Sequence, residues 1–282
     1  MQALSNQRTT LTTIASVAMF SRGLEPEFPE AVHRQLSTLR HPAREEGPHI
    51  RDLTALPWCS IDNDDSRDLD QLTVIEPLPK GAVRVMVAVA DVDALVKPGT
   101  PIDDHARYNT TSVYTSARVF HMLPERLCTD LTSLNLDEDR LALVTEMSFS
   151  DDGILTGSSI FRARVRNKAQ LAYDAVSAWI EGEADLPEAA LGLAGMATQL
   201  RMQDELAQKL RVLRHAQGSL EFESCQPKAL FEGDHITDIR QQQHNRGRQL
   251  IEEFMIATNG CTARFLSAQG RGALRRVVRS PE

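Results

Sequence analysis

The sequence predicts a protein of mixed α and β structure, and two observations carry this prediction. Apolar, β-prone runs such as residues 83–90 (VRVMVAVA) are typical of buried strands. Longer stretches such as residues 191–215 have leucines at helical spacing, which is typical of helices. The chain has 282 residues and a hydrophobic content of 41%, which is enough to form a substantial core.

The N-terminal part of the chain differs in pattern from the rest. Residues 9–20 predict a short helix, and a second helix is expected to start in the stretch 25–30. Residues 41–48 have the composition of a linker. We therefore expect residues 1–50 to form a small helical appendage with a linker, and residues 51–282 to form the main domain.

The main domain is expected to alternate strands and helices along the chain. A turn at residues 151–153 (DDG) separates two of the strands. Gly218 follows the longest helix, where glycine commonly ends a helix. The expected strands are 83–90, 141–149, 154–165 and 219–223. The expected helices are 169–181, 191–215 and 250–267.

Composition excludes several classes of protein. No apolar run reaches the length of a membrane span, and the N-terminus lacks the pattern of a signal peptide. The four cysteines are far apart and form no C-x-x-C pair, which disfavours a zinc site or a disulfide framework. We expect a cytoplasmic protein that has no membrane partner.

Charge is unevenly distributed along the chain. The net charge of −8 argues against a protein that simply coats nucleic-acid phosphates. Residues 240–282 nevertheless hold eight arginines against three glutamates, a local balance of +5. Arg162, Arg164 and Arg166 alternate with apolar residues, so a strand there would have one basic and one apolar face. The basic face could follow RNA phosphates or face solvent, and the sequence leaves both open.

The most distinctive stretch is residues 61–71, IDNDDSRDLDQ. Its aspartates are Asp62, Asp64, Asp65, Asp68 and Asp70. Carboxylates this close repel one another unless a cation lies among them. Such oxygen ligands favour Mg²⁺ or Mn²⁺ over Zn²⁺, and Mg²⁺ held by aspartates commonly serves phosphate chemistry. A solvated acidic loop is the alternative.

Two other metal-dependent interpretations of this stretch can be tested by spacing. An EF-hand loop starting at Asp62 needs glycine at its sixth position and glutamate at its twelfth, where the chain has Arg67 and Thr73. That interpretation fails. A phosphatase of the haloacid-dehalogenase type would have a D-x-D directly after an apolar strand, whereas Asp68-Leu69-Asp70 follows Asp64-Asp65-Ser66-Arg67. That interpretation is weak.

Several further segments occur in a fixed order along the chain. They are 83–92 (VRVMVAVADV), 100–114 (TPIDDHARYNTTSVY), 122–135 (MLPERLCTDLTSLN), 218–222 (GSLEF) and 246–259 (RGRQLIEEFMIATN). In these blocks, and in its aspartates, the chain from about Leu53 to Glu282 resembles the RNB catalytic domain of ribonuclease II and ribonuclease R. Several long blocks in order are more specific than one short motif.

The resemblance implies a fold and an activity. The fold is α+β, with a mixed β-sheet core flanked by helices and carboxylates at the bottom of a channel. The activity is that of an enzyme, a hydrolytic 3′-to-5′ exoribonuclease that acts on single-stranded RNA. Its expected products are nucleoside 5′-monophosphates, and its expected cofactor is Mg²⁺ or Mn²⁺.

The resemblance also implies roles for individual residues. The metal ligands would be Asp62, Asp68, Asp70 and Gln71. The catalytic residues would be Asp70, Asp68 and Tyr114. The RNA-binding residues would be Phe222, which stacks on terminal bases, Glu252, which lies near the terminal ribose, and Tyr114, which contacts the scissile phosphate.

The chain departs from the family pattern at two places. Gln71 stands where the family has a fourth aspartate, so metal affinity should fall unless Asp64 or Asp65 compensates. The alternative function is therefore a catalytically impaired RNB-like RNA-binding protein with a decayed metal site. The sequence also ends within the family's domain, so we expect a catalytic domain that is incomplete at its C-terminal end. We expect a monomer that a missing C-terminal segment completes.

Overall fold

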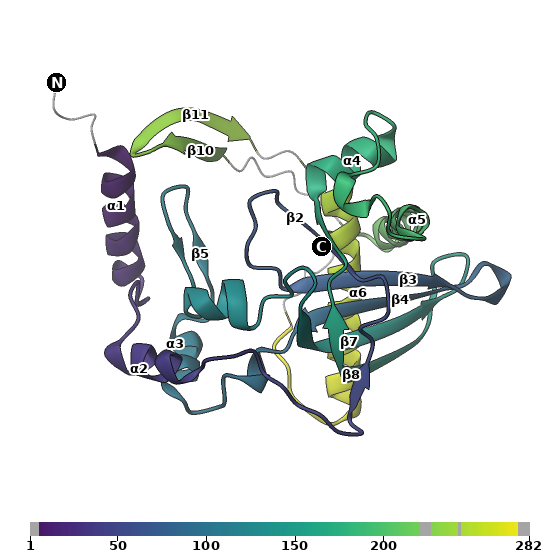
Figure 1. Ribbon diagram of the computed structural model, residues 1–282, viewed down its shortest axis with the longest axis horizontal. Helices are drawn as coiled ribbons and strands as arrows, with labels where there is room; N and C mark the ends of the chain where they lie inside the picture. Colours follow the sequence, from purple (N-terminus) through teal and green to yellow (C-terminus); the bar gives the residue numbers. More distant parts are fainter. Residues whose placement is uncertain (1–5, 220–226, 242–243, 276–282) are drawn as a thin grey trace. The chain divides into compact units, whose positions relative to one another are not determined.

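The computed structural model describes residues 6–219, 227–241 and 244–275. These residues form two compact units (Figure 1). The small unit comprises the described residues of Met1–Pro42, Val92–Leu131 and Phe222–Gln243. The sheet unit comprises those of Ala43–Asp91, Thr132–Glu221 and His244–Glu282.

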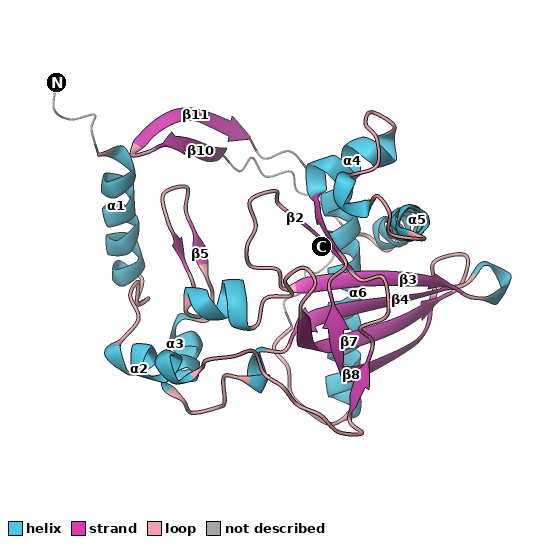
Figure 2. Ribbon diagram, in the orientation of Figure 1, coloured by secondary structure: helices cyan, strands magenta, loops and turns pink. Residues whose placement is uncertain are grey.

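The sheet unit is built on one seven-stranded sheet with the order β1-β8-β7-β4-β3-β2-β9 (Figure 2). The pairs β1–β8 and β2–β9 are parallel, whereas the other neighbouring pairs are antiparallel. This mixed sheet confirms the predicted α+β class. The strands are β1 (Ile50–Asp52), β2 (Cys59–Asp62), β3 (Gln71–Pro77), β4 (Val83–Ala90), β7 (Asp139–Phe149), β8 (Leu155–Arg166) and β9 (Ala169–Ala172).

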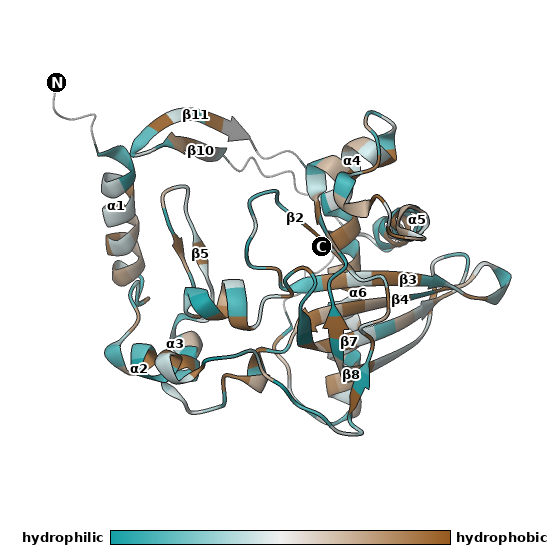
Figure 3. Ribbon diagram, in the orientation of Figure 1, coloured by the Kyte–Doolittle hydropathy of each residue, from teal (hydrophilic) through white to brown (hydrophobic). Residues whose placement is uncertain are grey.

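Strand β4 shows why an unbroken apolar run forms a central strand. Val85 and Val87 belong to the hydrophobic cluster that includes residues of the helices, whereas Met86 and Ala88 belong to a second cluster with Trp58. Successive side chains of a strand point to opposite faces, so this strand is buried on both. Figure 3 shows the hydrophobic residues along the central strands.

Three helices pack on one face of the sheet and contribute residues to the first of these clusters. They are α4 (Tyr173–Glu181), α5 (Met196–Ala216) and α6 (Arg246–Ala268). The predicted helix 250–267 is confirmed and is longer at its start. In the described part of the chain, no helix is both long enough and apolar enough to cross a membrane.

Two predicted helices were wrong at their starts. Residues 169–172 form strand β9 rather than helix, because they pair in parallel with β2 from Cys59 to Asp62. This partner lies far away in the sequence, so local propensity does not show it. The predicted helix 191–215 begins only at Met196, after Gly192 and Gly195 at positive φ. The predicted strand 219–223 lies almost entirely outside the described residues.

The small unit contains the helices expected at the N-terminus, namely α1 (Gln7–Ser21) and α2 (Glu30–Thr38). It also contains α3 (Pro101–Asn109), the hairpin of β5 (Val113–Tyr114) and β6 (Val119–Phe120), and the hairpin of β10 (Pro227–Glu232) and β11 (His235–Gln241). Its core is small and consists of Val32, Val96, Ile102, Leu127 and Leu131. The small unit also contains the short helical turns Val92–Ala94 and Leu127–Leu131, and the sheet unit contains Pro79–Gly81 and Glu188–Ala190.

Helix α3 was not predicted, although its start signals are present. Pro101 occupies the first turn, where its missing N–H costs nothing. Asp103 and Asp104 lie in the same turn and complement the helix dipole. Proline followed by acidic residues is therefore a usable start signal here.

Candidate metal and RNA site

The aspartates lie on a loop that joins two neighbouring strands of the sheet. We call residues 62–70 the acidic loop. It begins at Asp62, the last residue of β2, and ends where β3 begins. Asp62 Oδ1 accepts hydrogen bonds from the Asn63 backbone N–H at 2.7 Å and from Ser66 Oγ at 2.8 Å. These local bonds fold the first turn of the loop around Asp62.

The second half of the acidic loop is anchored to the sheet unit. Leu69 is buried, its backbone N donates to Ser133 Oγ at 3.0 Å, and its carbonyl accepts from Leu134 N at 2.8 Å. The carbonyl of Asp70 accepts from Ala90 N at 3.0 Å. Asp68 and Asp70 therefore flank Leu69, whose backbone N–H and carbonyl are both hydrogen-bonded.

Two of the predicted ligands, Asp62 and Asp68, act electrostatically on a third, Asp70. Removal of water by surrounding protein, followed by the charges of Asp62 and Asp68, raises the pKa of Asp70 to about 6. Asp70 as a whole residue is exposed to solvent. Asp70 is therefore partly surrounded by protein atoms, although the residue as a whole remains accessible. The charges of Asp62 and Asp68 thus act on the carboxyl of Asp70.

The donor chemistry of Asp62, Asp68 and Asp70 fits a hard divalent cation. All three donors are carboxylates, and a cation would relieve the repulsion that disfavours ionisation of Asp70. Within the described ranges, no three His, Cys, Asp or Glu residues are close enough together to form a ready metal-binding group. The agreement with a divalent cation therefore rests on the chemistry and charge of the oxygen donors. The described residues of the acidic loop do not enclose a preformed metal site.

The pKa of Asp70 makes the stability of the metal-free protein depend on pH. Between its ordinary value of 3.8 and about 6, Asp70 keeps its proton in the folded state and loses it in the unfolded state. The free energy of unfolding contributed by Asp70 should therefore fall as the pH rises through this window. We expect urea unfolding in EDTA to show wild type losing stability relative to Asp70→Asn between pH 4 and 7. A difference that is constant over this range would contradict the assigned environment.

Gln71 has a neutral partner in the structure. The residue is 7% exposed, and its Nε2 donates to the carbonyl of Ile61 at 3.4 Å. Ile61 immediately precedes Asp62, so the amide of Gln71 connects the two ends of the acidic loop. The metal-binding role of Gln71 remains a prediction.

Sequence reasoning missed two residues next to the acidic loop, Tyr173 and Arg248. Burial, followed by the charge of Asp62 and then that of Asp70, raises the pKa of Tyr173 to about 12, and the charge of Arg248 opposes this. Arg248 Cζ lies 4.5 Å from the ring centroid of Tyr173, and its Nη2 donates to Asn63 Oδ1 at 2.5 Å. Asn63 and Arg248 are 185 residues apart, so no local pattern could have joined them.

The start of α6 is fixed against the first turn of α4. Asn245 caps α6, because its Oδ1 accepts from Arg248 N at 3.1 Å, and its Nδ2 donates to Asp174 Oδ1 at 2.6 Å. Gly247 N donates to Ser177 Oγ at 2.8 Å. These bonds position Arg248 beside the acidic loop.

Gly247→Ala should destabilise the protein, because an added Cβ would lie 2.7 Å from the carbonyl oxygen of Tyr173. One helix would have to move away from the other, and overpacking of this kind costs about 2 kcal/mol. Gly157→Ala is the matched control, since a Cβ there meets nothing within 4 Å. Urea unfolding curves measure both variants. Equal stability of the two variants would show that the helices do not approach this closely.

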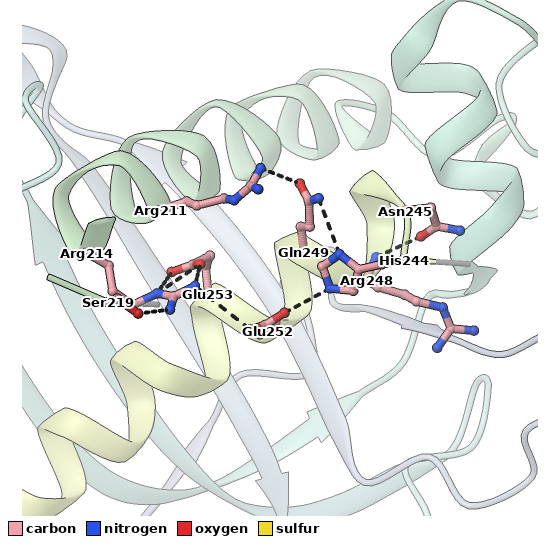
Figure 4. A network of polar contacts seen from close by, with 9 residues as sticks. All are labelled: Arg211, Arg214, Ser219, His244, Asn245, Arg248, Gln249, Glu252 and Glu253. Carbon is pink, nitrogen blue, oxygen red and sulfur yellow. Dashed lines mark hydrogen bonds and ion pairs between the residues drawn. The ribbon is translucent and has the colours of Figure 1, made fainter. Parts of the chain in front are cut away.

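Glu252 and Glu253 on α6 have different environments (Figure 4). Glu252 is exposed, and its Oε2 pairs with His244 Nε2 at 3.1 Å. Glu253 is 3% exposed and pairs with Arg214, whose Nε lies 3.2 Å from both carboxylate oxygens. Arg214 Nη2 also lies 3.9 Å from Glu252 Oε1. Glu252 is therefore accessible to a ligand, whereas Glu253 is part of the protein interior.

The predicted RNA-binding roles of the two aromatic residues, Tyr114 and Phe222, are not tested by the structure. Tyr114 lies in β5 of the small unit and is 67% exposed. Phe222 lies outside the described residues. Their roles in RNA binding therefore stay predictions.

The arginines of β8 show the predicted two faces. Ala163 and Val165 are fully buried, and the arginines that alternate with them point to the other face. Each arginine is paired with a carboxylate of the sheet unit. The pairs are Arg162 with Asp91 at 2.7 Å, Arg164 with Asp52 at 2.6 Å, and Arg166 with Asp139 at 2.6 Å. These ion pairs favour a structural role for the basic face over a phosphate-binding groove.

The sheet unit thus combines a mixed sheet, three helices on one face of that sheet, and a loop with several carboxylates between two adjacent strands. The family model described as the RNB domain matches residues 50–282. The chain belongs to the RNB domain family.

Named relatives agree with this assignment. The chain is 38% identical over 256 residues to Ribonuclease R of Escherichia coli (strain K12), covering 90% of this chain and 31% of that protein. It is 32% identical over 254 residues to Exoribonuclease 2 of Escherichia coli O1:K1 / APEC, covering 89% of this chain and 38% of that protein. The chain therefore spans about a third of the length of these relatives.

A solved structure shares the fold. It is Mycoplasma genitalium RNase R in complex with ribose methylated single-stranded RNA. The TM-score is 0.83 at 23% sequence identity, and the match covers 94% of this chain and 40% of that chain. The small unit and the sheet unit thus both have counterparts in that fold.

Proposed function

We propose that this chain contributes the acidic site of a metal-dependent 3′-to-5′ exoribonuclease. The enzyme would hydrolyse single-stranded RNA and release nucleoside 5′-monophosphates. The observation that carries the proposal is the position of Asp62, Asp68 and Asp70 on the acidic loop, where the charges of Asp62 and Asp68 act on Asp70. Membership of the RNB family, relatives named as ribonucleases and a neighbour determined with single-stranded RNA support it.

In this proposal the carboxylates hold Mg²⁺ or Mn²⁺. Asp62, Asp68 and Asp70 would be its ligands, with the amide oxygen of Gln71 as a neutral fourth. When bound, a divalent ion supplies positive charge that lowers the pKa of water and offsets the charge developing on the phosphate. Asp70 would orient the attacking water, because the residue is exposed and its pKa is raised by burial and by the charges of Asp62 and Asp68.

The remaining residues would hold the RNA end. Glu252 would accept a hydrogen bond from the 2′-hydroxyl of the terminal ribose, which distinguishes RNA from DNA. His244 and Arg214 limit the orientations of Glu252. Phe222 would stack on terminal bases without regard to sequence, and Tyr114 would donate a hydrogen bond to the scissile phosphate.

Product analysis tests this function directly. A 5′-labelled single-stranded oligoribonucleotide is incubated with the chain and Mg²⁺, the labelled fragments are separated by size, and the released mononucleotides are identified by chromatography against 5′- and 3′-monophosphate standards. We expect progressive shortening from the 3′ end, release of nucleoside 5′-monophosphates, and loss of both in EDTA. The matching oligodeoxyribonucleotide should remain intact. Internal cleavage, nucleoside 3′-monophosphates or undiminished cleavage in EDTA would contradict the proposal.

The second candidate is an RNA-binding protein whose metal site has decayed. Gln71 favours it, because the amide is neutral and its nitrogen is bound to the Ile61 carbonyl. Calorimetric titration with Mn²⁺ in the presence of a short oligoribonucleotide separates the two candidates. RNA binding with no heat from Mn²⁺ would favour the binding protein, whereas saturable Mn²⁺ binding would favour the enzyme.

A further inference from the structure

Arg248 connects three separate segments of the sheet unit. It lies in the first turn of α6, its guanidinium stacks over Tyr173 at the start of α4, and its Nη2 donates to Asn63 on the acidic loop. A planar guanidinium can stack and donate in its own plane at the same time, which a lysine ammonium cannot. We refer to Arg248, Tyr173 and Asn63 as the arginine clamp.

The backbone around the clamp is held independently of the guanidinium. Asn245 caps α6 and bonds Asp174, and Gly247 N bonds Ser177 Oγ. The side chain of Arg248 therefore extends from a fixed point. Its contact with Asn63, the neighbour of Asp62, ties the first turn of the acidic loop to the start of two helices.

The clamp also lies within the field of the aspartates. The pKa of Tyr173 responds to Asp62, Asp70 and Arg248 together. Arg248 thus places a positive charge beside Tyr173, a ring that also lies within reach of the charges of Asp62 and Asp70.

We infer that Arg248 is a positioning residue, which orders the acidic loop by holding Asn63 and the ring of Tyr173 together. The inference rests on the proposed function insofar as the ordered loop serves RNA hydrolysis. The clamp itself is defined by contacts between described residues and needs no bound metal or RNA.

Hydrogen–deuterium exchange of the full chain without metal tests the clamp. We expect Arg248→Lys and Asn63→Ala each to speed exchange in peptides covering residues 61–71 by about tenfold, because each removes the hydrogen bond between the stacked guanidinium and Asn63. The double variant should exchange no faster than either single variant, because both break the same link. Exchange in the second half of α6 should not change.

Arg201→Lys is the matched control, because Arg201 Cζ also lies 4.5 Å from an aromatic ring, that of Trp179. It should leave exchange in residues 61–71 unchanged. Unchanged exchange in Arg248→Lys, or an equal increase in Arg201→Lys, would overturn the inference.

A Mn²⁺ titration adds a second test. Loss of loop order and loss of positive charge should change the Mn²⁺ affinity in opposite directions. Removing a positive charge beside a cation site should by itself raise Mn²⁺ affinity. If Arg248 orders the ligands, Arg248→Gln should instead lower the affinity, by about tenfold. Higher affinity in this variant would overturn the positioning role. Faster loop exchange in Arg248→Lys together with an inactive wild type would support the clamp and refute the nuclease function.

Discussion

Asp70→Asn should reduce the release of mononucleotides by about 10³-fold, within the usual range for loss of a group that positions or activates a nucleophile. The substitution keeps the size of the side chain and removes the charge that burial, Asp62 and Asp68 act on. The affinity for single-stranded RNA should change little, because the stacking and ribose contacts are assigned to other residues. Single-turnover cleavage at saturating protein measures the chemical step, and a binding titration in EDTA measures the affinity.

Asp152→Asn is the control for this experiment. Asp152 is an exposed aspartate in the turn between β7 and β8, outside the acidic loop, and its replacement should leave cleavage unchanged. Turnover near the wild-type rate in Asp70→Asn would remove Asp70 from the mechanism. A parallel loss of RNA affinity would instead indicate that the carboxylate holds the RNA rather than serving the chemical step.

Arg214→Met should lower the free energy of unfolding by about 3 kcal/mol, because it leaves the carboxylate of Glu253 buried without its cation. Glu253 is 3% exposed, and the substitution removes the arginine hydrogen bonds to its carboxylate together with the bond from Nη1 to Ser219 Oγ at 2.5 Å. Methionine keeps much of the length of the aliphatic stem, so the loss reports mainly the ion pair. Urea unfolding at neutral pH measures it.

Arg211→Met provides the comparison for Arg214. Arg211 lies on the same helix, α5, and donates to Gln249 Oε1 at 3.3 Å rather than to a buried carboxylate. Arg211→Met should lower the free energy of unfolding by well under half as much as Arg214→Met. Similar losses in the two variants would show that the buried pair with Glu253 is not what holds α5 against α6.

The parts of the fold that local patterns determine could be predicted from the sequence. The run at 83–90 forms β4 with these bounds, because a strand buried on both faces requires apolar residues throughout. Residues 250–267 lie within α6, because one stripe of this helix packs into the core. The aspartates of the candidate site were visible for the same reason, since they lie within one short segment.

The parts that depend on distant partners could not be predicted. Strand β9 exists because β2 offers it a parallel edge. Tyr173 and Arg248 reach the acidic loop only because α4 and α6 both begin beside it. The difference between exposed Glu252 and buried Glu253 depends on Arg214 from another helix. Each of these is a tertiary contact that a local pattern does not record.

The central claim is that the carboxylates of the acidic loop hold a divalent ion, and anomalous X-ray scattering from crystals grown with Mn²⁺ and a short oligoribonucleotide tests it most directly. We expect an anomalous peak within coordination distance of Asp62 and Asp70 that disappears in Asp70→Asn. A map with no peak at the acidic loop, while the same crystals contain bound RNA, would contradict the claim.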